Sequence, residues 1–153
     1  MTTNEPGEVA PESQDALPAD EGDPDLATLV RIANTGGMSL GVTLLVGGAT
    51  VSGLLVGSAE FFDGLAAYME ARGGDGGAVL AKLYRQQATD FREAIGTDFE
   101  KAFSAPYVAT FIHLQDARVF APGGRYLPTD EGLFWRGRLD SIDGWSIGNL
   151  GTT

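Results

Sequence analysis

The first patterned stretch of the chain is an apolar stripe at helical spacing. Its members recur every three or four residues: Leu26, Leu29, Val30 and Ala33. Asp23 suits the N-cap of such a helix and Pro24 suits its first position. Gly36-Gly37 follows the last apolar residue and ends the helix. The pattern therefore predicts an amphipathic helix that starts at Pro24.

Two β-rich runs come next along the chain. Residues 40–46 and 49–56 are rich in Val, Leu and Thr, and only Gly47-Gly48 separates them. A two-residue glycine linker between such runs is typical of a tight hairpin turn. We therefore expect an antiparallel pair of strands here.

The pattern then turns helical. Ser58 suits the N-cap of a helix whose apolar positions are Phe61, Phe62, Leu65, Tyr68 and Met69. The glycine-rich residues 73–77 should break it as a flexible linker, since no P-loop signature surrounds them. A longer amphipathic stretch follows, with Leu80, Leu83, Tyr84, Phe91, Ile95, Phe99 and Phe103 on one broad face. We expect that face to point to the core, with docking of a partner as the alternative.

Three further strands are predicted after Ala105-Pro106, in residues 107–120, 132–139 and 145–150. Glycines lie inside the predicted strands of the chain at Gly53, Gly137 and Gly148, which favours strongly bent strands over a flat sheet. The whole pattern predicts an α+β fold. It has an N-terminal helix, a small five-stranded barrel and a helical pair inserted at about 58–104.

Acidic residues are concentrated at the N-terminus. The chain has 153 residues, 21 Asp+Glu and 10 Lys+Arg, for a net charge of -11. Residues 1–23 hold seven of the acids and no Lys or Arg. Their apolar residues are too few to offset an ordering cost of about 1–2 kcal/mol per residue. We expect a disordered acidic tail over 1–23 and a single globular domain over 24–150.

Composition excludes several kinds of function. The chain has no cysteine, so disulfides, cysteine-bound zinc, iron–sulfur clusters and thiol catalysis are excluded. It has one histidine, which excludes a histidine-rich metal site, and no cofactor or metal is expected. Net acidity disfavours nucleic acid as a partner. No secretory signal or membrane-length apolar run is visible, so the sequence indicates a soluble, cytoplasmic protein.

His113 is the first residue to consider for chemistry. It lies in a predicted strand, three residues before Asp116, so the two side chains point to opposite faces. No G-x-S-x-G elbow accompanies it. A structural strand residue is favoured over a catalytic base, with pH sensing left open, and no catalytic residue is assigned. Asp140 and Asp143 are interpreted as turn residues.

One compact basic and aromatic patch stands out. Phe134, Arg136 and Arg138 share one face of a predicted strand. The simpler interpretation is a solvated face paired to Asp116 or Asp140. The functional interpretation is a contact surface for an acidic partner, including the chain's own N-terminal tail.

The predicted barrel resembles the Sm-like fold, in which a helix precedes five bent strands. The first hairpin is similar through Val42, Leu44, Gly47 or Gly48, Val51, Gly53 and Leu55. Later parts are similar through Ile112-His-Leu-Gln-Asp-Ala117 and Arg136-Gly137. The resemblance implies an Sm-like or SH3-like barrel, and an Sm-like RNA-binding module is the alternative function.

A second resemblance covers most of 24–150. Residues 41–62, 111–118 and 134–138, the last followed by Asp143-Gly-Trp-Ser-Ile-Gly148, resemble the gas vesicle accessory protein U family. The resemblance implies a non-enzymatic accessory protein of gas vesicles, the protein-shelled buoyancy compartments. It would contact the shell and other gas vesicle proteins in assembly, clustering or surface modulation. We also expect a homo-oligomer, because small open barrels leave free strand edges.

Overall fold

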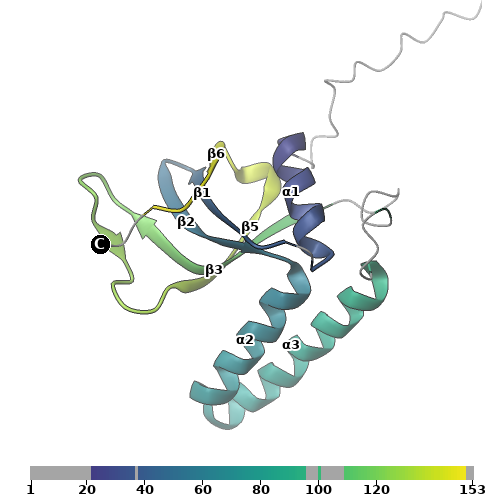
Figure 1. Cartoon of the computed structure of the whole chain (residues 1–153). Helices are drawn as coiled ribbons and strands as arrows, with labels where there is room; N and C mark the ends of the chain where they lie inside the picture. The colour runs from purple at the N-terminus through teal and green to yellow at the C-terminus, as the bar shows by residue number, and fades with distance from the viewer. Residues whose placement is uncertain (1–21, 37, 96–99, 101–108, 151–153) are drawn as a thin grey trace, which may run out of the picture.

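The described residues of the computed structural model, 22–36, 38–95, 100 and 109–150, form an α+β fold (Figure 1). Its helices are α1 (Pro24–Asn34), α2 (Ser58–Arg72), α3 (Gly74–Ile95) and the 3-10 helix η1 (Leu139–Ser141). Its strands are β1 (Leu40–Val46), β2 (Ala49–Val56), β3 (Phe111–Phe120), β4 (Tyr126–Leu127), β5 (Leu133–Arg138) and β6 (Gly144–Ile147). The predicted tail lies, up to residue 21, outside the described residues.

Helix α1 begins where the sequence predicts. Asp23 is extended, and its Oδ1 accepts hydrogen bonds from the backbone N–H groups of Asp25 (2.9 Å) and Leu26 (3.1 Å). These bonds satisfy two of the donors that every helix start leaves free. The predicted apolar stripe is the side on which α1 is buried.

The β1–β2 hairpin is also confirmed. Val46 pairs with Ala49, and Gly47 and Gly48 have φ angles of 56° and 83°. Positive φ at both central residues is what a type I′ turn needs, and glycine adopts it without strain.

The sheet has six strands rather than the predicted five. Its antiparallel pairing runs β4-β3-β2-β1-β6, and β5 pairs with β3 on the same edge as β4. Among the described residues no ladder joins β6 back to β4 or β5, so the pairing is open. The extra strand arises because residues 121–125 form a tight return, in which Ala121 N–H donates to the Arg125 carbonyl.

Two register shifts, one against β2 and one against β5, bend the sheet at β3. The β2–β3 register shifts between Ser52 and Leu54, around Gly53, as the glycine predicted. A Cβ at Gly53 would lie 2.9 Å from the Cα of Ala117, so no larger residue fits. On the other edge the register shifts before Ala117, where Asp116 has a φ of 50°. Such bulges increase the local twist and curl the sheet.

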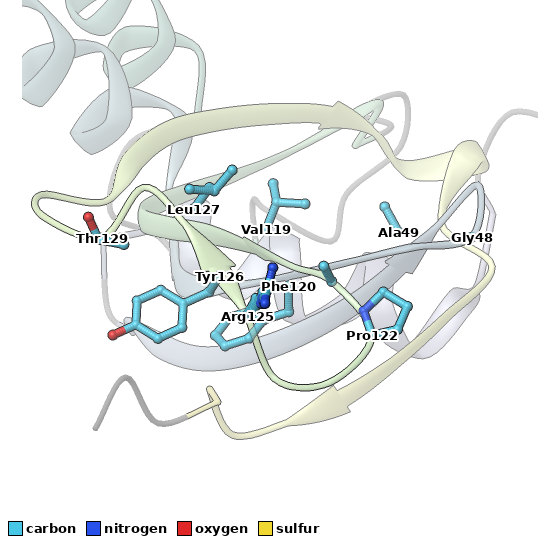
Figure 2. A pocket seen from close by; sticks show the side chains of 10 residues that line it. Gly48, Ala49, Val119, Phe120, Pro122, Arg125, Tyr126, Leu127 and Thr129 are labelled. Atoms are coloured by element: carbon cyan, nitrogen blue, oxygen red, sulfur yellow. The ribbon is translucent and has the colours of Figure 1, made fainter.

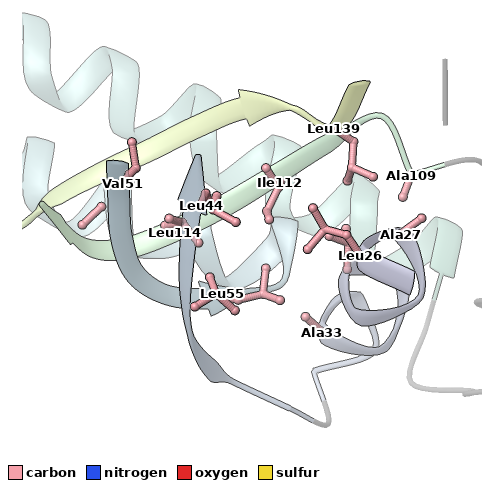
Figure 3. Close-up of a cluster of buried hydrophobic side chains, with 13 residues drawn as sticks. Leu26, Ala27, Ala33, Leu44, Val51, Leu55, Ala109, Ile112, Leu114 and Leu139 are labelled. Carbon is pink, nitrogen blue, oxygen red and sulfur yellow. The ribbon is translucent and has the colours of Figure 1, made fainter. Parts of the chain in front are cut away.

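The main core lies between α1 and the curled sheet (Figure 3). Its largest fully buried side chains come from α1, from three strands and from η1: Leu26, Val30, Val42, Leu44, Leu55, Ile112, Leu114 and Leu139. Burial of each such side chain contributes about 1.5–3 kcal/mol. Helix α1 therefore covers one end of the sheet.

The inserted helices α2 and α3 lie side by side and project away from the sheet (Figure 1). Two details differ from the prediction. Ser58 is the first helical residue, and the N-cap is Gly57 without a side-chain hydrogen bond. Gly74–Gly77, predicted to be a flexible linker, is the first turn of α3, so only Gly73 separates the helices. Close contact favours glycine at Gly73 and Gly77, and a φ of +60° favours it at Gly74.

The buried side of α3 is narrower than predicted. Its buried members are small or terminal: Gly77, Ala81, Ala88 and Ile95. Tyr84 and Phe91 are half-buried, whereas Leu80 and Leu83 are 39% and 53% exposed. Phe99 and Phe103 lie outside the described residues. Small side chains on the seam let α3 approach α2 closely, which turns the two leucines outward.

Replacing Gly77 by alanine is expected to destabilise the protein by about 1–3 kcal/mol. A Cβ at this position would lie 2.4 Å from the carbonyl oxygen of Met69, a backbone atom that can move only with α2. Urea unfolding followed by circular dichroism measures the loss.

Gly76→Ala is the matched control. Gly76 is in the same turn, and a Cβ there meets nothing within 4 Å. Alanine should stabilise this helix by up to about 1 kcal/mol. Equal effects of the two substitutions would contradict the close approach of α2 and α3.

Candidate interaction site

Phe134 of the predicted patch faces α2. Its ring centroid lies 5.8 Å from that of Phe61 and 5.7 Å from that of Tyr68, both in edge-to-face contacts. Edge-to-face aromatic pairs contribute about 0.5–1.5 kcal/mol beyond their buried area. Phe134 is half-buried, and both of these ring contacts are with the inserted helix α2.

The two arginines of the patch have different partners. Arg138 donates from Nε to Oδ1 of Asp140 (3.1 Å) and from Nη2 to Oδ2 (2.8 Å), which confirms the predicted pair with Asp140. Arg136 donates from Nε to Nε2 of His113 (3.1 Å), and its guanidinium lies 3.6 Å from the ring centroid of Phe111. Asp116 does not reach the patch, because it pairs with Arg118 at 2.9 Å.

A buried chain of hydrogen bonds begins at Arg136. The Nε2 atom of His113 accepts from Arg136, which leaves Nδ1 to donate to Ser58 Oγ at 3.2 Å. Ser58 Oγ in turn donates to Oδ1 of Asn34 (3.3 Å), and the Ser58 backbone N–H donates to the same atom (3.0 Å). This polar chain connects the end of α1, the start of α2, β3 and β5.

The environment of His113 keeps its imidazole neutral. Burial, followed by the positive charge of Arg136, lowers the pKa of His113 from 6.5 to about 3. The side chain is 2% exposed and packs against the rings of Phe61 and Phe62. At neutral pH the residue does not change its charge, which removes the pH-sensing role that the sequence left open.

In the contact between Ser58 and His113 the imidazole donates the hydrogen bond, whereas in nucleophilic catalysis it would have to accept the serine proton. A general base needs a pKa near the working pH, and an orienting carboxylate commonly helps to provide it. Here a guanidinium occupies the second imidazole nitrogen and lowers its basicity. The arrangement supports His113 as a structural residue. Sequence reasoning missed the contact because the two residues are 55 positions apart.

A cavity of about 810 Å³ lies beside the β3–β4 hairpin (Figure 2). Most of its lining residues are apolar: Gly48, Ala49, Val119, Phe120, Ala121, Pro122, Arg125, Tyr126, Leu127 and Thr129. The only charged one is Arg125. In Figure 1 this hairpin is on the far side of the sheet from α1. We call this site the hairpin cavity.

The strand register explains why the hairpin cavity is apolar. Val51 pairs with Val119, and Val119 pairs with Leu127, so these side chains share one face of the sheet. Val51 is buried in the core, whereas Leu127 is 70% exposed. The apolar face that α1 covers at one end thus continues to Val119 and Leu127, which are 37% and 70% exposed. Phe120 and Tyr126, one position away on the same strands, line the cavity from the opposite face. The sequence signal was the apolar residue Leu127, which lies between the predicted strands 107–120 and 132–139.

Two other kinds of site are absent from the described part of the chain. No group of three or more His, Asp or Glu side chains there could hold a metal ion. No helix within it has both the length and the apolar character to cross a membrane.

The fold and the hairpin cavity define a small α+β protein with an uncovered apolar end and a projecting pair of helices. The chain belongs to the family described as gas vesicle protein GvpU-like, whose model matches residues 23–150. The resemblance noted in the sequence is thereby confirmed. Comparison with curated proteins and with solved structures gave no match.

Acid is expected to destabilise the fold through His113. Because its folded-state pKa of about 3 lies below the unfolded value of 6.5, only the unfolded chain takes up this proton between these values. The contribution is fully present above pH 6.5 and is lost, by roughly 1 kcal/mol per pH unit, as the pH falls toward 3. Urea unfolding at a series of pH values measures it.

His113→Gln is the control for this prediction, since glutamine can donate and accept hydrogen bonds but cannot titrate. The variant should be less stable at neutral pH and should lose stability less steeply on acidification. Parallel pH profiles for the two proteins would contradict the assignment to His113.

Proposed function

We propose that this protein is a non-enzymatic gas vesicle accessory protein that acts in the cytoplasm through protein–protein contacts. Its partners are the gas vesicle shell or other gas vesicle proteins, in assembly, clustering or modulation of the vesicle surface. The family supports the link to gas vesicles. The observation that favours a contact function is the uncovered hairpin cavity.

The hairpin cavity is suited to an apolar anchor on a partner protein. Soluble proteins rarely expose contiguous apolar surface without a role in binding. Burial of apolar area contributes about 25 cal/mol per Å², and anchors that fill pockets provide most of the affinity at interfaces. Leu127, with most of its side chain exposed, is placed to contribute such burial. Arg125 would favour a partner with a carboxylate near that anchor.

Two alternatives receive less support. An enzyme would need an activated nucleophile. Here the His113 imidazole donates to Ser58 Oγ, and its lowered pKa makes it a poor base. An Sm-like RNA-binding module would need a surface with an excess of positive charge, yet the chain has a net charge of -11 and Asp140 offsets the charge of Arg138. The Sm-like barrel itself stays a hypothesis, since the strand pairing is open.

A second copy of the chain is another partner to consider, at a different surface. In the described part of the sheet β6 is an edge strand, and such edges pair readily with another copy. Homo-oligomerisation is therefore part of the proposal. Light scattering over a range of concentrations tests it, and a monomeric mass throughout would remove this part.

Leu127→Ser is expected to weaken binding to purified gas vesicles by about tenfold in a co-flotation assay, as truncation of an interface anchor does. Stability should change little, because the side chain is mostly exposed. Val79→Ser is the matched control: Val79 lies on α3, is 72% exposed and is distant from the hairpin cavity in sequence. Equal binding of both variants and the parent protein would contradict the proposed site.

A further inference from the structure

The described part of the chain begins beside the end of β5. Gly22 has a φ of +62°, and a Cβ there would lie 2.7 Å from the carbonyl oxygen of Leu139 and 3.2 Å from the Cα of Asp140. The glycine therefore packs directly against the start of η1. Arg138 is the residue that precedes η1, so the described chain begins, at Gly22, next to it.

The segment that leaves there is acidic throughout. Residues 1–21 contain no Lys or Arg and six carboxylates: Glu5, Glu8, Glu12, Asp15, Asp20 and Glu21. A chain spans at most about 3.3–3.6 Å per residue, so Asp20 and Glu21 stay within about 7 Å of Gly22. The other four can reach farther along β5.

The nearby face of β5 carries cationic groups that can donate hydrogen bonds to further carboxylates. A guanidinium has five N–H donors, and Asp140 uses two of those of Arg138. Arg138 is 60% exposed. Arg136 lies two residues earlier on the same face, about 7 Å away. Its Nε bonds to a neutral imidazole, and no described carboxylate forms an ion pair with it.

We propose that the acidic segment 1–21 folds back onto Arg136 and Arg138 of its own chain. The contact is electrostatic, and it is carried by complementary charge and by the exit of the segment beside Arg138. It does not depend on the proposed role in gas vesicles. The segment competes with any acidic partner for these two guanidinium groups.

The strength of this contact follows from its exposure. Exposed ion pairs contribute about 0–1 kcal/mol each, so no single pair holds the segment. The covalent connection raises the local concentration of carboxylates to about the millimolar range, which favours contact within one chain. Salt screens exposed charges, and the Debye length falls from about 10 Å at 0.1 M to about 3 Å at 1 M. The segment should therefore bind at low salt and dissociate at high salt.

Paramagnetic relaxation in the full-length protein tests the proposal. The chain has no cysteine, so Thr3→Cys provides the only thiol for a nitroxide label, far from Gly22 along the sequence. At low salt the label should broaden the backbone amide signals of residues 136–140 more than those of residues 79–83 on α3. The excess broadening should disappear in 1 M salt.

Three variants separate charge pairing from the effect of the covalent tether alone. Arg138→Gln should remove most of the excess broadening, whereas Arg125→Gln, at the hairpin cavity, should leave it unchanged. Replacement of the six acids by their amides leaves residues 22–153 intact and should abolish it. Broadening that survives high salt or the amide replacements would overturn the proposal. Broadening of unlabelled, isotope-enriched chains by separate labelled chains would overturn it too, because the contact would then be between molecules.

Discussion

The polar chain from the buried Asn34, Ser58 and His113 to the exposed Arg136 is the constraint on which the arrangement of the elements depends. Its members come from α1, α2, β3 and β5, and its hydrogen bonds measure 3.0–3.3 Å. A buried donor or acceptor without a partner costs about 1–3 kcal/mol, so displacing one element leaves its neighbours unsatisfied. Gly57 adds a steric condition, because a Cβ there would lie 2.5 Å from the Ala33 carbonyl oxygen. Helix α2 can start only where α1 ends.

This constraint also accounts for the surfaces that the protein offers. It holds α1 over one end of the sheet and fixes the direction in which α2 and α3 project (Figure 1). Among the described residues the opposite end has no such cover, so the apolar face that contains Val51 continues to Val119 and Leu127, which line one side of the hairpin cavity. The imidazole stays neutral because it is buried beside Arg136. The same histidine that stabilises the fold is thereby unsuited to catalysis.

Local rules predicted what depends on neighbours in sequence. The Asp23 cap, the Gly47-Gly48 turn and the bend at Gly53 were all predictable, because each needs only a few adjacent residues. Periodicity failed at α3: Leu80 fits the apolar stripe but faces solvent, since alanines and Gly77 form the seam with α2. The patch on β5 and the pairing of Arg138 with Asp140 were predicted. The link from Arg136 through His113 to Ser58 was not predictable, because it joins residues that are distant in sequence. The link to gas vesicles came from resemblance rather than from residue chemistry.

The most direct test of the account is photo-crosslinking from the hairpin cavity in the presence of purified gas vesicles. The chain has no cysteine, so Leu127→Cys can carry a single benzophenone, with Val79→Cys as the control on α3. We predict covalent adducts with a gas vesicle protein from position 127 and few from position 79. Equal yields from both positions, or adducts only between copies of this chain, would contradict the claim that the uncovered end of the sheet contacts gas vesicle proteins.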